Sequence, residues 1–238
     1  MRPRLIGGLI LLLLCSIAAA HGQRPGDAAE PPVLTLYLEG DNRSPSSFRA
    51  LRHLEARTEH FGASAWMDVW TEADESGFRY RVAGEGGSGS IRTKVFRALL
   101  AREQNAWDAD QWALAEISPA NYIFDDHAVP ADGLARLGIT ARRKDVLLVN
   151  GTIVLDPDDG NLVRVEGLLS KTPSFWIRQV RISRRYERIS GVRMPVSVES
   201  AADVILFGRS SFTMSYRYDA VNGRRADAGR VHAAVSEP

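Results

Sequence analysis

The sequence contains one cysteine, Cys15, and it lies within the segment that carries the clearest sorting pattern. Arg2 and Arg4 are followed by the apolar run 5–17 and by three alanines that end at Ala20. A basic start, a short apolar core and a small-residue cleavage site are typical of a secretory signal peptide. We expect cleavage after about Ala20, which leaves a mature chain without a disulfide or a thiol nucleophile.

Long apolar runs are also scarce. The run 5–17 is shorter than the roughly 20 residues that a membrane-spanning helix needs. Lipid attachment at Cys15 is disfavoured, because Leu14 stands where a lipoprotein signal has a small residue. We therefore predict a periplasmic protein whose mature chain has no transmembrane span.

Neither sign of charge is in excess. The chain has 30 Lys and Arg against 29 Asp and Glu, and removal of Arg2 and Arg4 with the signal leaves 28 basic residues and a net charge of −1. Proteins that bind nucleic acid usually carry a clear basic excess. We therefore predict no nucleic-acid partner.

The mature chain has the length of one domain and is long enough to form a core without disulfides. Residues 21–32 are rich in glycine, proline and alanine, and we predict that they form a disordered lead. The folded domain is predicted over residues 33–223, followed by a flexible tail over residues 224–238.

Two segments have the start signals and apolar spacing of helices. Ser44 precedes a proline, and both residue types favour a helix start, so a helix is predicted over residues 45–58. A second helix is predicted over residues 91–106, with Ser90 as its cap. Its apolar stripe consists of Ile91, Val95, Phe96, Leu99 and Leu100. Residues 84–89 hold four glycines and are predicted to act as a flexible hinge.

Strand patterns occupy most of the remaining sequence. Strands are predicted over residues 33–38, 61–71, 77–83, 121–125, 134–142, 145–155, 162–169, 175–187, 192–199, 203–207 and 211–219. Short turns separate the late ones, for example at residues 156–160, Ser190-Gly191 and Ala201-Ala202, and Asn150-Gly151 is a further candidate turn. Strands joined by short turns are antiparallel neighbours, because parallel pairs need long crossovers. The predicted fold class is α+β, mainly β, with a curved antiparallel sheet covered by a few helices.

The late strands alternate between apolar and polar residues, which gives the sheet one dry face. That face carries Trp176, Val180, Ile182, Tyr186, Met194, Val196, Phe212, Met214 and Tyr216. An apolar sheet face must be buried against other elements, and the two predicted helices are short compared with the number of strands that they would have to cover. Either the helices and the sheet fill one another completely, or an apolar groove remains. Alternation alone favours a filled core.

Arg178 and Arg184 share the face of Trp176 and Tyr186. A guanidinium group beside aromatic rings can hold a phosphate or carboxylate head group while the rings contact its tail. The alternative is an exposed basic face that acidic neighbours balance.

Residues for catalysis or metal binding do not form a recognisable set. His53 and His60 lack the spacing of four that zinc sites on helices prefer. The acidic turn 156–160 resembles the start of a calcium loop, but Gly167 stands where the glutamate is expected. We predict no catalytic residue, no metal site and no cofactor.

Three segments resemble the periplasmic lipoprotein carriers and outer-membrane lipoprotein-sorting proteins, the LolA/LolB-like group. They are residues 149–157, which contain Asn150-Gly151 and end in Asp-Pro, residues 186–195, and residues 216–222. The resemblance implies an unclosed antiparallel half-barrel, capped by helices, whose apolar cavity shelters acyl chains. It also implies an arginine inside the cavity on an early strand, for which Arg79 and Arg81 are the candidates.

The resemblance leads to the expectation of a non-enzymatic envelope protein that binds or carries a lipid or an acylated protein. Ligand exchange would proceed by movement around residues 84–89. The alternative is a structural or signalling module with a fully packed sheet that binds another envelope protein along an edge strand. An enzyme on the same scaffold is the third and least favoured hypothesis.

Overall fold

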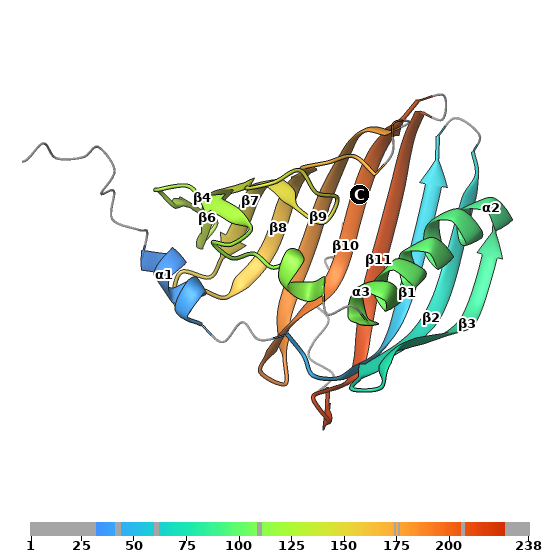
Figure 1. Ribbon diagram of the computed structural model, residues 1–238, viewed down its shortest axis with the longest axis horizontal. Coiled ribbons are helices and arrows are strands. Elements are labelled where there is room, and N and C mark those ends of the chain that lie inside the picture. The colour runs from blue at the N-terminus through green and yellow to red at the C-terminus, as the bar shows by residue number, and fades with distance from the viewer. Residues whose placement is uncertain are drawn as a thin grey trace, which may run out of the picture.

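The computed structural model describes residues 32–40, 44–59, 62–108, 111–173, 175, 177–205 and 208–226. The predicted signal peptide 1–20, the lead up to residue 31 and most of the predicted tail lie outside these ranges. Within them the chain forms a sheet of twelve strands that curves around one side, on which helices lie (Figure 1). Among the described helices, none is long and apolar enough to cross a membrane.

The sheet is antiparallel throughout, and its order is β3-β2-β1-β11-β10-β9-β8-β7-β6-β4, with β12 beside β11 and β5 beside β6. The strands are β1 Phe48–Thr58, β2 Ser64–Asp74, β3 Gly77–Gly87, β4 Tyr122–Phe124, β5 Val129–Ala131, β6 Leu134–Ala141, β7 Val149–Leu155, β8 Leu162–Leu169, β9 Ile177–Ile189, β10 Val192–Val204, β11 Gly208–Val221 and β12 Arg224–Arg225. The two ends, β3 and β4, do not pair with each other, so the sheet stays open. The predicted class, mainly β with an unclosed half-barrel, is confirmed.

One helical segment lies across β1–β3 and consists of α2 Gly89–Ile91, the π-helical η1 Arg92–Arg97 and α3 Ala98–Asp108. Its cap is Ser88 rather than the predicted Ser90, because the Ser88 hydroxyl accepts a hydrogen bond from the N–H of Ile91. The other helices are α1 Pro32–Glu39 and the short η2 Gln111–Leu114.

The π-helical turn changes which residues of the predicted apolar stripe are buried. A π-turn brings residues five apart onto one face, so Phe96 lies above Ile91 and both are buried together with Leu100. Val95 would face the sheet in a regular α-helix, but here it is 40% exposed. The prediction of Val95 as a core residue was therefore wrong.

The late hairpins follow the predicted turns in most places. Ser190 and Gly191 have φ angles of 53° and 82°, the positive values that a tight two-residue hairpin turn requires, and they join β9 to β10. The predicted turn at Ala201-Ala202 does not exist, because β10 continues to Val204. Asn150-Gly151 is not a turn either but part of β7. Gly151 is needed there because a Cβ would stand 2.1 Å from the carbonyl oxygen of Glu166.

Two early elements were predicted with the wrong type. Residues 45–58, predicted as a helix, contain strand β1, which pairs with β2 on one side and with β11 on the other. These two ladders outweigh the helix propensity of its Ala, Leu, Arg and Glu residues. Residues 33–38, predicted as a strand, lie in helix α1, where Val33, Leu34 and Tyr37 share the buried side.

The predicted glycine hinge at residues 84–89 is largely part of strand β3, which is paired with β2 as far as Gly87. Two of its glycines provide a flat surface for the indole ring of Trp66. A Cβ on Gly86 would stand 2.5 Å from Trp66 Nε1, and one on Gly84 would stand 3.3 Å from the ring. These glycines therefore serve close packing rather than movement.

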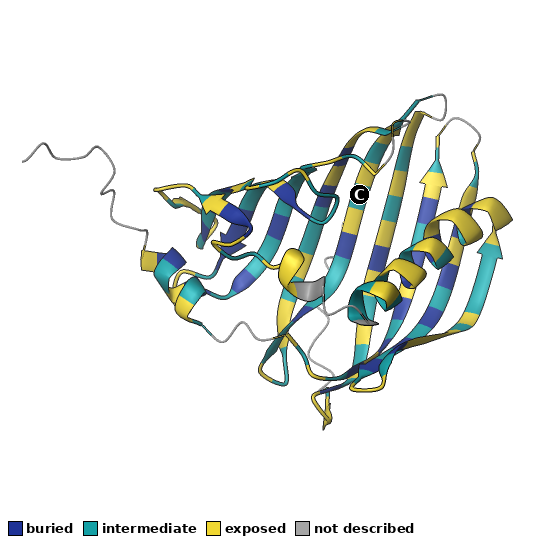
Figure 2. Cartoon of the chain, viewed as in Figure 1, coloured by how far each residue is buried: buried dark blue, intermediate teal, exposed yellow. Residues whose placement is uncertain are grey.

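Burial alternates along the strands, as expected for a sheet with one dry face (Figure 2). Cross-strand pairing aligns the dry residues into rows. One row runs through Leu137, Ile153, Val165, Arg184, Val198, Met214, Leu54 and Met67 on eight neighbouring strands. Its seven apolar members are all buried.

Candidate ligand-binding groove

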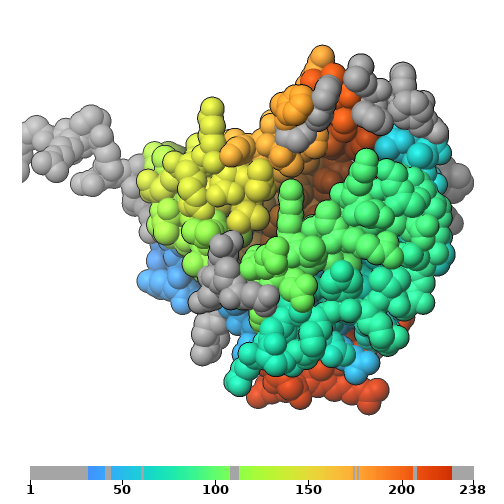
Figure 3. All heavy atoms as spheres, turned by 45° about the vertical axis from the view of Figure 1, so that its right-hand side comes forward, coloured from blue at the N-terminus to red at the C-terminus, as the bar shows by residue number. Residues whose placement is uncertain are grey.

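The inner side of the sheet is hollowed between the helix α3 and the flank that contains residues 130–165 (Figure 3). The floor of this hollow consists of the late strands β9–β11, coloured orange, which no described helix covers completely. Tyr186, Val196, Phe212 and Tyr216 lie on these strands and are only half-buried. We refer to this hollow as the groove.

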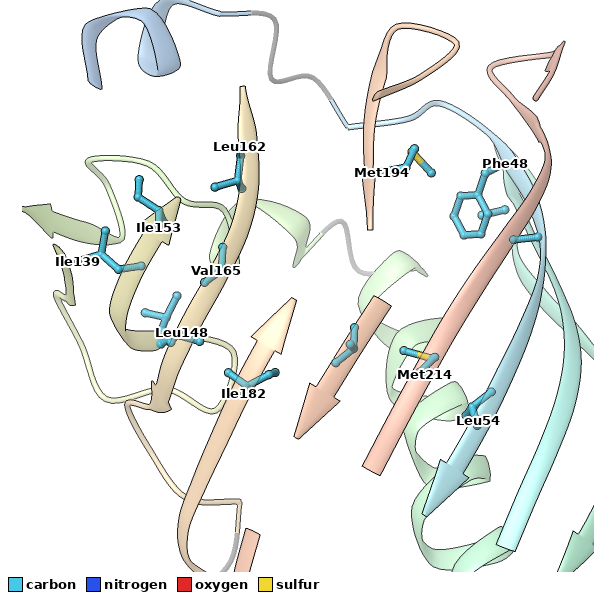
Figure 4. Close-up of a cluster of buried hydrophobic side chains, with 14 of the residues drawn as sticks. Phe48, Leu54, Ile139, Leu148, Ile153, Leu162, Val165, Ile182, Met194 and Met214 are labelled. Carbon is cyan, nitrogen blue, oxygen red and sulfur yellow. The ribbon is translucent and has the colours of Figure 1, made fainter. Parts of the chain in front are cut away.

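The nine residues predicted for a cavity wall divide into three groups. Val180, Ile182, Met194 and Met214 are buried and belong to the interior of the protein. Tyr186, Val196, Phe212 and Tyr216 are partly buried, and Trp176 lies outside the described residues. Figure 4 shows Ile182 between the Ile153–Val165 group on one flank and the Met214–Leu54 group on the other. The sheet is thus well packed at both flanks and less covered in the middle.

Aromatic side chains gather beneath α3 at one end of the groove. The ring of Phe48 contacts Trp107 and Tyr218 edge-on, with centroids 5.9 and 6.2 Å apart. Tyr218 stacks on Tyr216 at 5.9 Å, and Phe96 of the helical segment lies 6.2 Å from Phe212. Aromatic contacts of this kind add to the apolar area that each ring buries.

A buried ion pair joins the sheet to α3. Arg52 of β1 is 1% exposed and donates hydrogen bonds of 2.5 and 2.8 Å to the two carboxylate oxygens of Glu103. The guanidinium lies 4.8 Å from the ring centroid of Tyr216, 5.5 Å from that of Phe78 and 5.8 Å from that of Phe48. Arg52 therefore occupies the centre of the aromatic group.

Burial and the neighbouring charges shift the pKa values of Arg52 and Tyr216 in opposite directions. Burial disfavours the charged form of Arg52, but the carboxylate of Glu103 outweighs it and raises the pKa of the guanidinium. Burial also raises the pKa of Tyr216 to about 12, although the charge of Arg52 lowers it. The pair is thus charged and the phenol neutral at physiological pH.

The helical segment also forms hydrogen bonds with residues of β2 and β3. Gln104 donates to the carbonyl oxygen of Phe78 at 3.0 Å, and Trp107 donates to that of Asp74 at 3.3 Å. Arg92 and Arg97 donate to Glu85 at 2.7 and 2.8 Å. These hydrogen bonds hold the helical segment over β2 and β3, at one side of the sheet.

The opposite flank is held by a separate network. The buried Asn121 donates to the carbonyl oxygens of Ala113 and Glu116, and its own side-chain oxygen accepts a 2.6 Å bond from Arg143. Tyr37 of α1 donates to the carbonyl oxygen of Ile117 at 2.8 Å, and burial raises its pKa to about 12. This network fixes the segment between η2 and β4 at the border of the groove.

The two predicted head-group residues lie in different surroundings. Arg184 is partly buried on the dry face, opposite Val165 of β8 and Val198 of β10. Arg178 is exposed near the start of β9. The structure therefore brings Arg184, but not Arg178, to the floor of the groove.

The buried arginine on an early strand is Arg52, and neither Arg79 nor Arg81 takes this place. Both of those residues are exposed, and Arg79 is bound to Asp74 at 2.6 Å. The segment Phe48–Thr58 contains the signal that would have found Arg52. Its apolar residues Phe48, Ala50, Leu54 and Ala56 alternate, and Arg52 interrupts the series on the same face.

Metal-ligand clusters are missing from the part of the chain that the structure describes: no three His, Cys, Asp or Glu side chains gather there. Asp125, Asp126 and His127, the ligand-type run of the sequence, are all exposed. The inner face thus combines an apolar floor, aromatic rings and the two inward arginines Arg52 and Arg184.

No protein-family model matches the sequence, and no curated protein matches it. Among solved structures, the chain is similar to a DUF1329 family protein from Desulfovibrio piger, with 13% sequence identity and a TM-score of 0.36. The match covers 83% of this chain and 91% of that chain. A similarity this weak identifies no family for the chain.

Proposed function

We propose that this protein is an exported, periplasmic, non-enzymatic protein that binds or carries a lipid or an acylated protein in the groove. One observation carries the proposal: aromatic and aliphatic side chains on β9–β11, the strands that form the floor of the hollow, are only partly buried. Apolar surface that a protein gathers in a concave place and leaves partly open is typical of a ligand site.

The energetics support a chain-like apolar ligand. Each methylene group that leaves water contributes roughly 0.8 kcal/mol, so burial of a few methylenes gives useful affinity. The floor offers the partly buried rings of Tyr186 on β9 and Phe212 on β11, which lie on the same face of the sheet. An acyl chain fits this surface because its contacts need no matching hydrogen bonds.

The helix α3 is the element that would move when a ligand enters. Its contacts with Arg52, Phe78 and Asp74 hold it over β1–β3, so its displacement would extend the groove into the aromatic group. In the LolA/LolB-like carriers, which the sequence motifs resemble, an arginine lies inside the cavity on an early strand. Arg52 of β1 is the inward arginine on an early strand of this chain, and a displacement of α3 would open it to the groove.

The proposal is tested by native mass spectrometry of the protein purified from the periplasmic fraction, with lipid extraction of the same sample. We expect co-purifying lipid or acylated peptide. Phe212→Glu places a charge on the floor and should remove it, whereas Thr213→Glu on the opposite face of the same strand should not. Wild-type protein that never carries or accepts lipid would refute the proposal.

A module that binds an envelope protein is the second candidate. Strand β3 favours it, because this strand of eleven residues lies at an end of the sheet, with Tyr80 exposed. A free strand edge can pair with a strand of another chain. Absence of lipid together with specific capture of one protein, lost when a proline replaces Arg81, would favour this candidate.

A further inference from the structure

Arg184 interrupts an otherwise apolar row of the dry face. Val165 lies opposite it on β8 and Val198 on β10, and both are buried. Ile182, the preceding residue on the same face of β9, is buried as well. A guanidinium group in such surroundings loses much of its hydration, which is unfavourable unless an anion or hydrogen-bond acceptors replace the water.

The inner face offers Arg184 no such compensation from the described residues. Arg52, the other arginine of this face described above, has the two carboxylate oxygens of Glu103. For Arg184, no ion pair or hydrogen bond with any residue in the described ranges is present, and its side chain is partly open to the groove. One inward charge is thus neutralised within the protein and the other faces the hollow.

A tyrosine hydroxyl group on the same face of β9 is also available. The hydroxyl of Tyr218 donates to the carbonyl oxygen of Pro195, and that of Tyr122 accepts from the N–H of Val149. In the described part of the chain, the hydroxyl group of Tyr186 has no hydrogen-bond partner. Tyr186 follows Arg184 by two residues on the same face, so both can reach one ligand group.

We propose that the groove selects an anionic amphiphile, a carboxylate or phosphate on an alkyl chain, whose head group binds Arg184 and whose tail lies on the apolar floor. The proposal rests on the proposed function and adds the class of ligand. An arginine presents a planar fork of donors that matches the two oxygens of a carboxylate or phosphate. A neutral chain would leave the guanidinium without an anion inside the apolar row.

The test compares two ligands that share one chain and differ in the head group, sodium oleate and oleyl alcohol, titrated below their aggregation limits with calorimetric detection. The variants are Arg184→Gln and Arg184→Lys. Arg185→Gln is the matched control, because Arg185 is the next residue, exposed on the other face opposite Ser197. Circular dichroism checks the fold of each variant.

We expect oleate to bind wild-type protein about tenfold or more tightly than oleyl alcohol, since charge-assisted hydrogen bonds are the strong ones. Arg184→Gln should remove this preference by weakening oleate alone, and Arg184→Lys should restore part of it. Arg185→Gln should change neither affinity. Inorganic phosphate should fail to displace oleate at comparable concentration, because it lacks the tail.

Each other outcome overturns the inference. Unchanged oleate affinity in Arg184→Gln, or an equal loss for both ligands, removes the head-group role of Arg184. Phosphate that competes as well as oleate makes the site a plain anion site. If oleyl alcohol binds and oleate binds no better, the carrier proposal survives without an anionic head group, and if neither binds, both proposals fail.

Discussion

Removal of the negative charge from Glu103 should destabilise the protein, because it leaves Arg52 as an unpaired cation in the interior. Glu103→Gln keeps the size and one acceptor oxygen of the side chain but removes its charge. Arg52 is 1% exposed, so it cannot turn to water without displacing the rings of Phe48, Phe78 and Tyr216. The perturbation therefore acts on the charge itself rather than on the packing of α3.

The magnitude follows from the burial of the two partners. Breaking a buried ion pair by removing one partner costs about 3–5 kcal/mol. The side chain of Glu103 is 21% exposed, so water reaches that end of the pair and reduces the loss. We expect Glu103→Gln to lower the free energy of unfolding by about 2–3 kcal/mol.

Urea denaturation followed by circular dichroism measures this difference, with the slope of the transition as a check on two-state behaviour. The double variant Arg52→Met with Glu103→Leu replaces both charges by apolar groups and should recover most of the lost stability. Arg102→Gln is the matched control, because Arg102 is exposed on the same helix. It should change the stability by no more than about 0.5 kcal/mol.

A double variant as unstable as Glu103→Gln would show that the loss comes from altered packing and not from the unpaired charge. A single variant as stable as wild type would show that the pair does not hold α3 at all. Either result would refute the account of the Arg52–Glu103 pair.

Two further predictions concern the outer face of β1–β3. His53 donates a 2.7 Å hydrogen bond from Nδ1 to the carboxylate of Asp68, which raises the pKa of the imidazole above its ordinary value of about 6.5. NMR titration should show this raised pKa and a lower one in Asp68→Asn, and the same pKa in both proteins would refute it. Protonated His53 therefore stabilises the fold at low pH, and this contribution is lost as the pH rises through the folded-state pKa. Gly86→Ala should lower the free energy of unfolding, measured by urea denaturation, by about 1–3 kcal/mol, because its Cβ would meet the ring of Trp66. Gly89→Ala is the control and should not lower it, because its Cβ would stand 3.6 Å from its nearest neighbour. Equal stability of the two variants would contradict this packing.

The late half of the fold was predictable because its signals are local. Residues 211–219 alternate strictly, and the Ser190-Gly191 turn carries the two positive φ angles that its sequence favours. Face assignments follow directly from such alternation. The predicted dry residues Ile182, Met214 and Phe212 therefore lie on the inner face in the structure.

The early half was not predictable because its structure depends on distant partners. Segment 48–58 consists largely of helix-forming residues, and only its pairing with β2 and β11 makes it a strand. A helix over these residues would not place Arg52 on the inner face of the sheet, so the helix prediction excludes its ion pair with Glu103. The groove depends on how far α3 extends over the sheet, which periodicity does not determine.

The central claim is that an apolar ligand lies on the inner face of β9–β11, and two serines of β10 allow a direct test. Ser200 lies on that face opposite Phe212, and Ser197 lies on the other face opposite Ser215. Cys15, the one cysteine of the sequence, lies in the expected signal peptide, so Ser200→Cys and Ser197→Cys in a chain that starts after Ala20 can each carry a polarity-sensitive fluorophore. A blue-shifted, more intense emission on addition of oleate at position 200 and none at position 197 is the predicted result. Equal responses at both positions, or no response at position 200 while oleate binds, would contradict it.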